Sequence, residues 1–107
     1  YINRAKTSEV VLAASAARTC VSEINQSAKV LASADFTICD DSFQATLYAT
    51  GLSVDAAGVI TARGTIINAN DVSVLLTPTP ADATTGPITE WTCTGTGEPN
   101  WLPGSCK

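Results

Sequence analysis

The sequence predicts an α+β fold in which one long N-terminal helix packs on a four-stranded antiparallel sheet. Residues 1–24 repeat apolar side chains at spacings of three and four with no Gly or Pro between them, which is typical of an amphipathic helix. From about residue 47 the sequence changes to alternating, β-branched stretches separated by short turns. The helix has the only long amphipathic surface that can cover the apolar face of such a sheet.

The helix is expected over residues 1–24, which gives it a length of roughly 36 Å at about 1.5 Å per residue. Small alanines on its apolar face allow a flat sheet to approach closely. Ile2 and Ala5 already lie on this face, so we expect further helix before residue 1 and interpret the chain as a processed or truncated form. The apolar stripe consists of Val10, Ala13, Ala14, Ala17, Val21 and Ile24.

Residues 25–46 show no sustained periodicity and are expected to form a connecting loop, with one short helical turn at 27–32. Asp40 and Asp41 in this loop could bind a cation, but a turn or helix-cap role is favoured for them. Asn25-Gln26-Ser27 is an Asn-x-Ser triplet. Because such triplets arise often by chance, Asn25 is only a weak candidate for N-glycosylation.

Four strands are expected in the second half of the chain. Asp55-Ala56-Ala57-Gly58 predicts a tight hairpin with Gly58 at positive φ, and residues 68–71 and 81–87 are expected to turn the next two corners. Connections this short join antiparallel neighbours, so the sheet should be a meander. The strand candidates are residues 47–54, 59–66, 72–79 and 88–93.

Composition argues against a catalyst. The chain has 107 residues and a mass of 11.0 kDa, and we interpret it as one domain. Histidine is absent, so the commonest general base and the commonest metal ligand are both missing, and we predict no enzymatic activity, cofactor or metal. Six basic and ten acidic residues give a net charge of −4 with no basic run, which argues against nucleic acid as a partner. No segment has the roughly twenty apolar residues that cross a membrane.

Four cysteines, Cys20, Cys39, Cys93 and Cys106, could form disulfides or a zinc site. No Cys-x₂-Cys pair occurs, so zinc is disfavoured and disulfides formed in an oxidising compartment are expected. Three pairings are open to four cysteines, and the sequence alone does not choose among them. We favour 20 with 39 and 93 with 106, because each bridge would close one loop between or after predicted elements.

The last seventeen residues, WTCTGTGEPNWLPGSCK, contain both tryptophans and two of the cysteines. Trp91 is expected to pack on the core from the last strand. Trp101 lies in a turn between two prolines and is the better candidate for an exposed contact residue. Together with Glu98 and Asn100 in the same turn, it forms the predicted contact surface.

Three stretches of the chain resemble the globular part of bacterial type IV pilins with a short αβ-loop. YINRAKTSEVVLAASAARTCVSE resembles the second half of the pilin helix, and LSVDAAGVITARG resembles the first hairpin of the pilin sheet. VSVLLTPTPAD and GPITEWTCTGTGEPNWLPGSCK are similar to the last strands and the C-terminal disulfide loop. The most specific match is Trp91-x-Cys93 followed by Leu102-Pro103-x-x-Cys106.

The resemblance implies a pilin roll, with the helix at 1–24, the αβ-loop at 25–46, the sheet at 47–93 and a disulfide-bounded loop at 93–106, all in the single domain 1–107. The family's apolar first half of the helix, which holds the subunit in the inner membrane and then packs in the filament core, is absent here. A second bridge, between Cys20 and Cys39, is not general in the family. It would tie the end of the helix to the αβ-loop.

The function that the resemblance implies is that of a structural subunit of a type IV pilus, an extracellular filament on the bacterial cell surface that supports motility, surface adhesion or DNA uptake. Its partners would be the assembly machinery and other pilin subunits, the αβ-loop of one meeting the cysteine-closed tail of another. The isolated head is expected to be monomeric. The alternative is a minor pilin whose head binds DNA or a surface ligand, for which a basic stripe would be expected.

Overall fold

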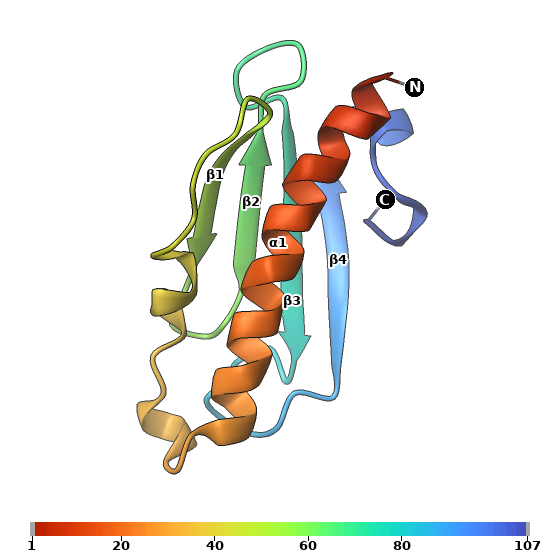
Figure 1. Ribbon diagram of the computed structural model, residues 1–107. Coiled ribbons are helices and arrows are strands. Elements are labelled where there is room, and N and C mark those ends of the chain that lie inside the picture. The colour runs from red at the N-terminus through yellow and green to blue at the C-terminus, as the bar shows by residue number, and fades with distance from the viewer. Residues whose placement is uncertain (1, 107) are drawn as a thin grey trace.

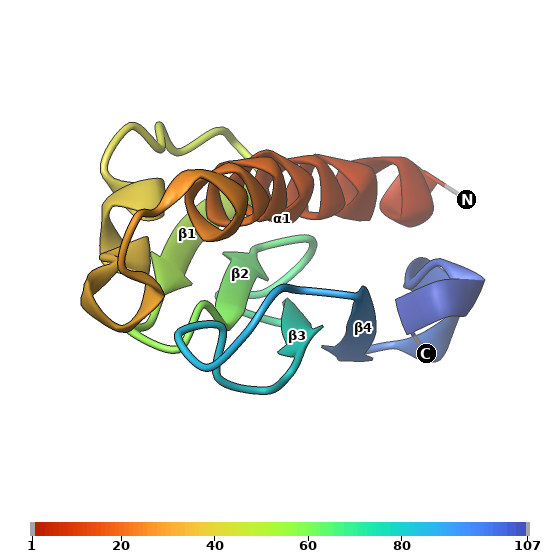
Figure 2. The same ribbon diagram turned by 90° about the horizontal axis from the view of Figure 1, so that it is seen from below.

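The computed structural model describes residues 2–106 of the chain. Its elements form two layers, because the helix α1 (Ile2–Ser27) lies on one face of a four-stranded antiparallel sheet (Figure 1, Figure 2). The strands lie side by side in chain order as a meander. The predicted α+β fold is therefore confirmed. The strands are β1 (Ala49–Val54), β2 (Ile60–Gly64), β3 (Val72–Thr79) and β4 (Glu90–Thr96).

Helix α1 ends at Ser27, close to one turn beyond the predicted end at residue 24. Its buried stripe begins later than expected: Ile2 is 72% exposed and Ala5 is exposed too, so their predicted place on the buried face was wrong. Figure 1 shows the reason, since α1 crosses the sheet diagonally and its first turn extends past the strands. The buried side chains of α1 are Thr7, Val10, Ala14, Ala17, Val21 and Asn25.

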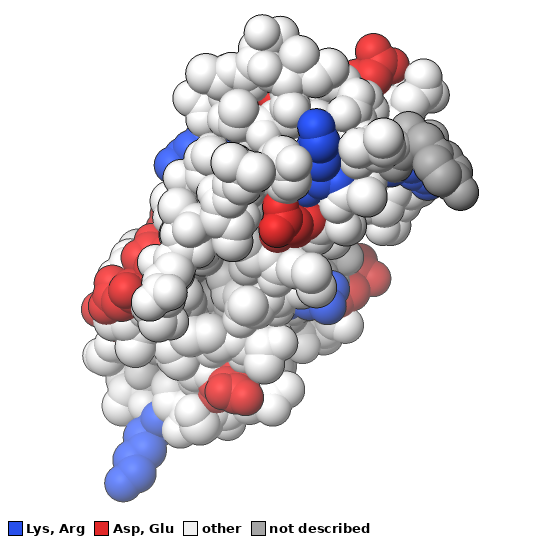
Figure 3. Space-filling view, turned by 45° about the horizontal axis from the view of Figure 1, so that its top comes forward, with Lys and Arg blue, Asp and Glu red and all other residues white. Residues whose placement is uncertain are grey.

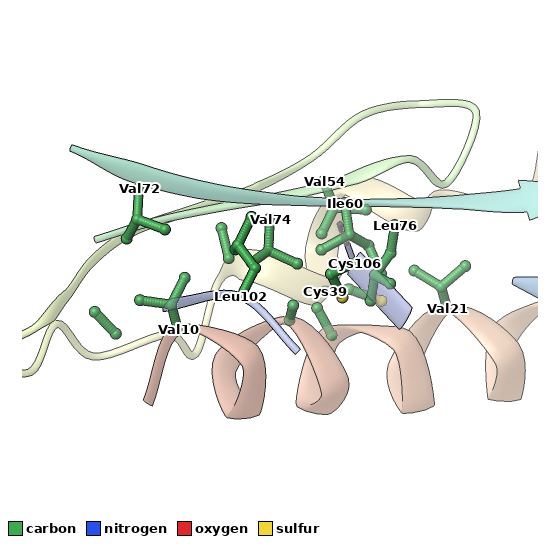
Figure 4. Packing of buried hydrophobic residues seen from close by; sticks show 14 of the residues in the cluster. Val10, Val21, Cys39, Val54, Ile60, Val72, Val74, Leu76, Leu102 and Cys106 are labelled. Carbon is green, nitrogen blue, oxygen red and sulfur yellow. The ribbon is translucent and has the colours of Figure 1, made fainter. Parts of the chain in front are cut away.

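The core lies between α1 and the inner face of the sheet (Figure 4). Along β3, every second residue is buried, the period-two pattern of a strand with one face on the core. Gly64 on β2 allows α1 to approach, because a Cβ at this position would clash with the side chain of Val10 and the carbonyl of Tyr48. The core side chains labelled in Figure 4 include Val10 and Val21 from α1, Ile60 from β2, and Val72, Val74 and Leu76 from β3.

The first hairpin forms as predicted, with Gly58 at a φ of +88°. The carboxylate of Asp55 holds the turn by accepting hydrogen bonds from the backbone amides of Ala57 (2.9 Å) and Val59 (3.0 Å). A Cβ on Gly58 would lie 3.2 Å from Cγ1 of Val21 on α1. Glycine is therefore favoured here twice, by its positive φ and by the close approach of the helix.

The second corner, at residues 68–71, is held by one carboxylate. Asp71 accepts hydrogen bonds from three successive backbone amides, those of Ile66 (2.8 Å), Ile67 (2.9 Å) and Asn68 (2.9 Å). Because these amides bind Asp71 instead of a neighbouring strand, β2 ends at Gly64 and not at residue 66 as predicted. Asn70 completes the corner with a φ of 54°.

The outer strands also differ from their predicted bounds. β4 begins at Glu90 instead of residue 88 and continues to Thr96 instead of ending at Cys93. β4 pairs with β3 along its length, from Glu90 opposite Thr79 to Thr96 opposite Ser73. β1 begins at residue 49 instead of 47, and the side chain of Leu47 is 78% exposed.

The segment between α1 and β1 contains two short 3₁₀ helices, η1 (Leu31–Ser33) and η2 (Phe36–Asp40). The helical turn expected at 27–32 is only partly correct, since α1 still includes residue 27 and η1 starts at residue 31. Phe36 is completely buried and anchors the segment in the core. Asp40 has a structural role, as favoured, because its Oδ2 accepts a hydrogen bond from the backbone amide of Val54 at the edge of β1 (2.9 Å).

Candidate functional site

Two disulfides fasten the ends of this fold. Cys20 on α1 is bonded to Cys39 on η2, and Cys93 on β4 is bonded to Cys106 at the end of the chain. The Cα atoms of the two pairs are 5.6 and 4.6 Å apart. The first bridge attaches the connecting segment to the helix, and the second closes the C-terminal tail onto the outermost strand.

The tail also has a non-covalent anchor, Leu102, whose side chain is 2% exposed. It packs against Gly95 of β4, where a Cβ would lie 2.8 Å from Cδ2 of Leu102 and 2.9 Å from the carbonyl oxygen of Cys106. The tail therefore closes tightly only because residue 95 has no side chain. Leu102 was singled out from the sequence only as part of the Leu102-Pro103-x-x-Cys106 match, and its burial was not predicted.

The three residues of the predicted contact surface lie in this tail but differ in exposure. Glu98 and Asn100 are exposed, whereas Trp101 is half-buried and packs against the core cluster. Trp101 ends the short helix η3 (Pro99–Trp101), which lies beside the first turns of α1 (Figure 1). Between the tail and α1 is a hollow of about 220 Å³, which we call the Trp101 hollow. It is lined by Arg4, Ser8, Val11, Trp101 and Pro103.

A second recessed surface lies on the other side of α1, against the segment that leads into β1. We call it the Glu9 groove. It has a volume of about 290 Å³ and adjoins a hollow of about 180 Å³ through the shared residues Ala13 and Phe43. Sequence reasoning did not identify this surface, because it forms only where residues far apart in the chain meet. The Glu9 groove is lined by Glu9, Leu12, Ala13, Phe43, Gln44, Thr46 and Ala49.

Trp91 packs on the core from β4, as expected, and its indole N–H donates to Oγ of Ser22 on α1 (3.3 Å). Asn25 is buried, and its side-chain nitrogen donates to the carbonyls of Ala83 (2.9 Å) and Gly86 (3.0 Å). This nitrogen is the atom to which an N-linked glycan would be attached. The glycosylation hypothesis for Asn25 is therefore wrong for the folded chain.

The family model described as pilin (bacterial filament) matches residues 3–107. The chain belongs to the pilin family. No curated protein and no solved structure matches it at the level of similarity that we required. As a pilin, the protein is a structural subunit of a bacterial pilus filament, its partners are other pilin subunits, and its place is the extracellular pilus on the cell surface.

The charges of this pilin are dispersed. On the face shown in Figure 3, Lys and Arg side chains alternate with Asp and Glu instead of gathering in a patch. The end of β2, which carries Arg63, and the end of α1, which precedes Lys29, lie at opposite ends of the molecule (Figure 1). In the described part of the chain, no group of three Asp, Glu or Cys side chains could hold a metal ion. Within residues 2–106, no helix has the length and apolarity needed to cross a membrane.

Two carboxylates of the pilin have lowered pKa values, and both stabilise turns. Desolvation acts to raise the pKa of Asp71, but hydrogen bonds from the backbone amides of Asn68, Ile66 and Ile67 outweigh it and lower the pKa. The pKa of Asp82 is lowered by hydrogen bonds from the side chain and the backbone of Thr84. Both groups are structural, and neither lies in the Trp101 hollow or the Glu9 groove.

Proposed function

We propose that this pilin is a major, fibre-forming subunit of a type IV pilus that supports motility, surface adhesion or DNA uptake. The observation that carries the proposal is the pair of recessed, mainly apolar surfaces on opposite sides of α1, the Trp101 hollow and the Glu9 groove. A subunit enclosed by neighbours needs complementary surfaces on more than one side. A head that acted only as a ligand-binding module would need one site.

The subunit also has to reach the filament. In type IV pilins an apolar half-helix precedes the globular head, and we propose the same for the precursor of this chain. That segment would hold the precursor in the inner membrane until the pilus assembly machinery incorporates it, and would then pack inside the filament. Residues 1–107 would act as one domain, because α1, the sheet and the tail contribute to one core. Without the apolar segment this domain is largely monomeric at micromolar concentrations.

We further propose that Glu98, Asn100 and Trp101 contact other molecules. Glu98 is exposed just before η3, and Asn100 is exposed on it. Trp101 forms one wall of the Trp101 hollow. A large aromatic side chain beside an open hollow is well suited to burial in a protein interface.

Complementation tests the major-subunit proposal. The full-length precursor is produced in a bacterium that has type IV pilus machinery but lacks its own major pilin, and surface fibres are sheared and analysed by mass spectrometry. We expect fibres in which this protein is the dominant component. Fibres that contain it only in trace amounts, with another pilin as the bulk, would show that it is a minor pilin.

The alternative, a minor pilin that binds DNA, is disfavoured by the dispersed cations. A gel-shift titration of the 107-residue chain with short duplex DNA distinguishes the two. We expect no complex at physiological salt. Tight binding that weakens steeply with added salt, and that Arg63→Glu reduces, would support the alternative, because phosphate neutralisation dominates affinity for DNA.

A further inference from the structure

Glu9 has a side-chain oxygen without a hydrogen-bond partner. Its Oε2 atom is shielded from solvent and has no hydrogen-bond partner, and among residues 2–106 no other buried side-chain nitrogen or oxygen is unpartnered in this way. Burying a carboxylate oxygen away from water without a hydrogen-bond donor costs free energy, so such a group in a native protein calls for an explanation. A donor on a second molecule would supply it once the Glu9 side chain, which lines an open groove, turns this oxygen outward.

The surroundings of Glu9 restrict what that donor can be. The Glu9 groove is mainly apolar, and Leu12, one helical turn from Glu9, is 68% exposed. A partner must therefore offer a cation to the carboxylate and an apolar recess to the leucine within about 6 Å of each other, the spacing of residues three apart on a helix. An arginine suits the first role, because its guanidinium binds carboxylates through paired hydrogen bonds.

The Trp101 hollow offers both features. Its lining combines Arg4 with the apolar residues Val11, Trp101 and Pro103, and its volume of about 220 Å³ is large enough for a leucine side chain. Arg4 itself is exposed. The tail segment that lines the hollow lies beyond β4 in Figure 2, whereas β1 and the segment before it, which line the Glu9 groove, lie on the opposite side of α1. The two surfaces of one chain therefore cannot meet each other.

We propose that the Glu9 groove of one copy of this chain binds the Trp101 hollow of a second copy, with Leu12 entering the hollow and Arg4 of the second copy pairing with Glu9. The inference rests on the proposed function of a filament subunit and names the side chains of one contact. Because the two surfaces lie on opposite sides of the same helix, the first copy of a bound pair still has its Trp101 hollow free and the second still has its Glu9 groove free. The contact therefore repeats from copy to copy without closing into a dimer.

Reciprocal charge reversal tests the contact. The ¹⁵N-labelled 107-residue chain is titrated with an excess of the unlabelled chain at low salt, and amide shifts are followed by NMR. For the wild type we expect concentration-dependent shifts at Leu12 and Ala13 and at the indole of Trp101. Glu9→Arg alone and Arg4→Glu alone should each weaken this association by roughly tenfold or more, because each places like charges opposite each other.

The decisive sample is an equimolar mixture of the two variants. In it, Arg at position 9 of one chain meets Glu at position 4 of the other, and Glu9 of the second chain meets Arg4 of the first, so the association should return. The double variant should associate like the wild type. Glu23→Arg and Lys29→Glu, at exposed positions outside both surfaces, are matched charge controls. Leu12→Gln, which keeps a good helix former at this exposed position, should weaken association without lowering the thermal midpoint of the monomer.

Absence of wild-type shifts at these residues would overturn the inference, as would single variants that associate like the wild type or a mixture that does not associate. Circular dichroism of each variant shows whether it is folded. The fibre experiment remains separate. If the full-length wild type forms fibres and the Glu9→Arg precursor forms them equally well, this contact is excluded while the proposed function stands.

Discussion

The side-chain nitrogen of Asn25 donates a 2.9 Å hydrogen bond to the backbone carbonyl of Ala83, 58 residues further along the chain. The same side chain donates to the carbonyl of Gly86 and accepts from the backbone amide of Ile88 (3.0 Å each). One buried amide thus satisfies three backbone groups of the segment between β3 and β4. It joins the last turn of α1 to the approach to β4.

Replacement of Asn25 by alanine should therefore lower the free energy of unfolding by about 3 kcal/mol, because buried backbone groups would lose their partners. Urea denaturation measures the change. Ser27→Ala removes the same Asn-x-Ser triplet but only an exposed hydrogen bond to Glu23, so it should have little effect. A loss of stability in Ser27→Ala equal to that in Asn25→Ala would contradict the structural role of Asn25.

Gly95→Ala should destabilise the pilin by about 2 kcal/mol, a typical cost of overpacking. The added methyl would meet Leu102 and the carbonyl oxygen of Cys106, so the tail would have to move away from β4. Gly104→Ala is the matched control, since a Cβ at residue 104 has no neighbour within 4 Å. Thermal melts of the two variants should differ clearly; coincident melts would mean that the tail does not pack closely on β4.

Cys93→Ser should lower the free energy of unfolding by about 3 kcal/mol, the chain-entropy value for a loop of this size. The bridge to Cys106 spans 13 residues, and its removal frees the unfolded chain from that constraint. Urea melts under non-reducing conditions measure the loss. Ser105→Ala, next to the bridge, leaves the disulfide intact and serves as the control. Superimposed melts of Cys93→Ser and the wild type would refute the prediction.

Asp71 should make stability depend on pH in the acid range. Its pKa is lowered below the ordinary value of 3.8 in the folded chain, so its contribution is complete above that value and is lost as the pH falls through the lower folded pKa. Urea midpoints measured from about pH 6 down to about pH 2 should fall more steeply for the wild type than for Asp71→Asn. The exposed Asp41→Asn serves as control and should follow the wild type. Parallel curves for wild type and Asp71→Asn would rule out this role.

The elements that the sequence predicted best are those whose pattern is local. β3 has its predicted bounds because every second residue from Val72 to Pro78 is apolar and faces the core, although Leu75 on the outward side is apolar too. The first hairpin was predictable because the carboxylate of Asp55 and the glycine at residue 58 both act within the turn. Neither feature needs information about distant parts of the chain.

The features that escaped prediction depend on how distant segments meet. The exposure of Ile2 follows from the diagonal path of α1 over the sheet, which no local pattern encodes. Asn25 resembled a glycan acceptor because its partners lie about sixty residues away. For the same reason the sequence indicated Trp101 but not the Glu9 groove, which needs residues 43–49 to lie against α1.

The C-terminal tail lies along the outer side of β4 and is covalently attached there, while Asp40 binds the backbone amide of Val54 at the opposite edge of the sheet (Figure 2). Uncovered sheet edges recruit further strands and lead to aggregation. The tail that the Cys93–Cys106 bridge holds beside β4 therefore takes up space that a further strand would need in order to pair with this edge.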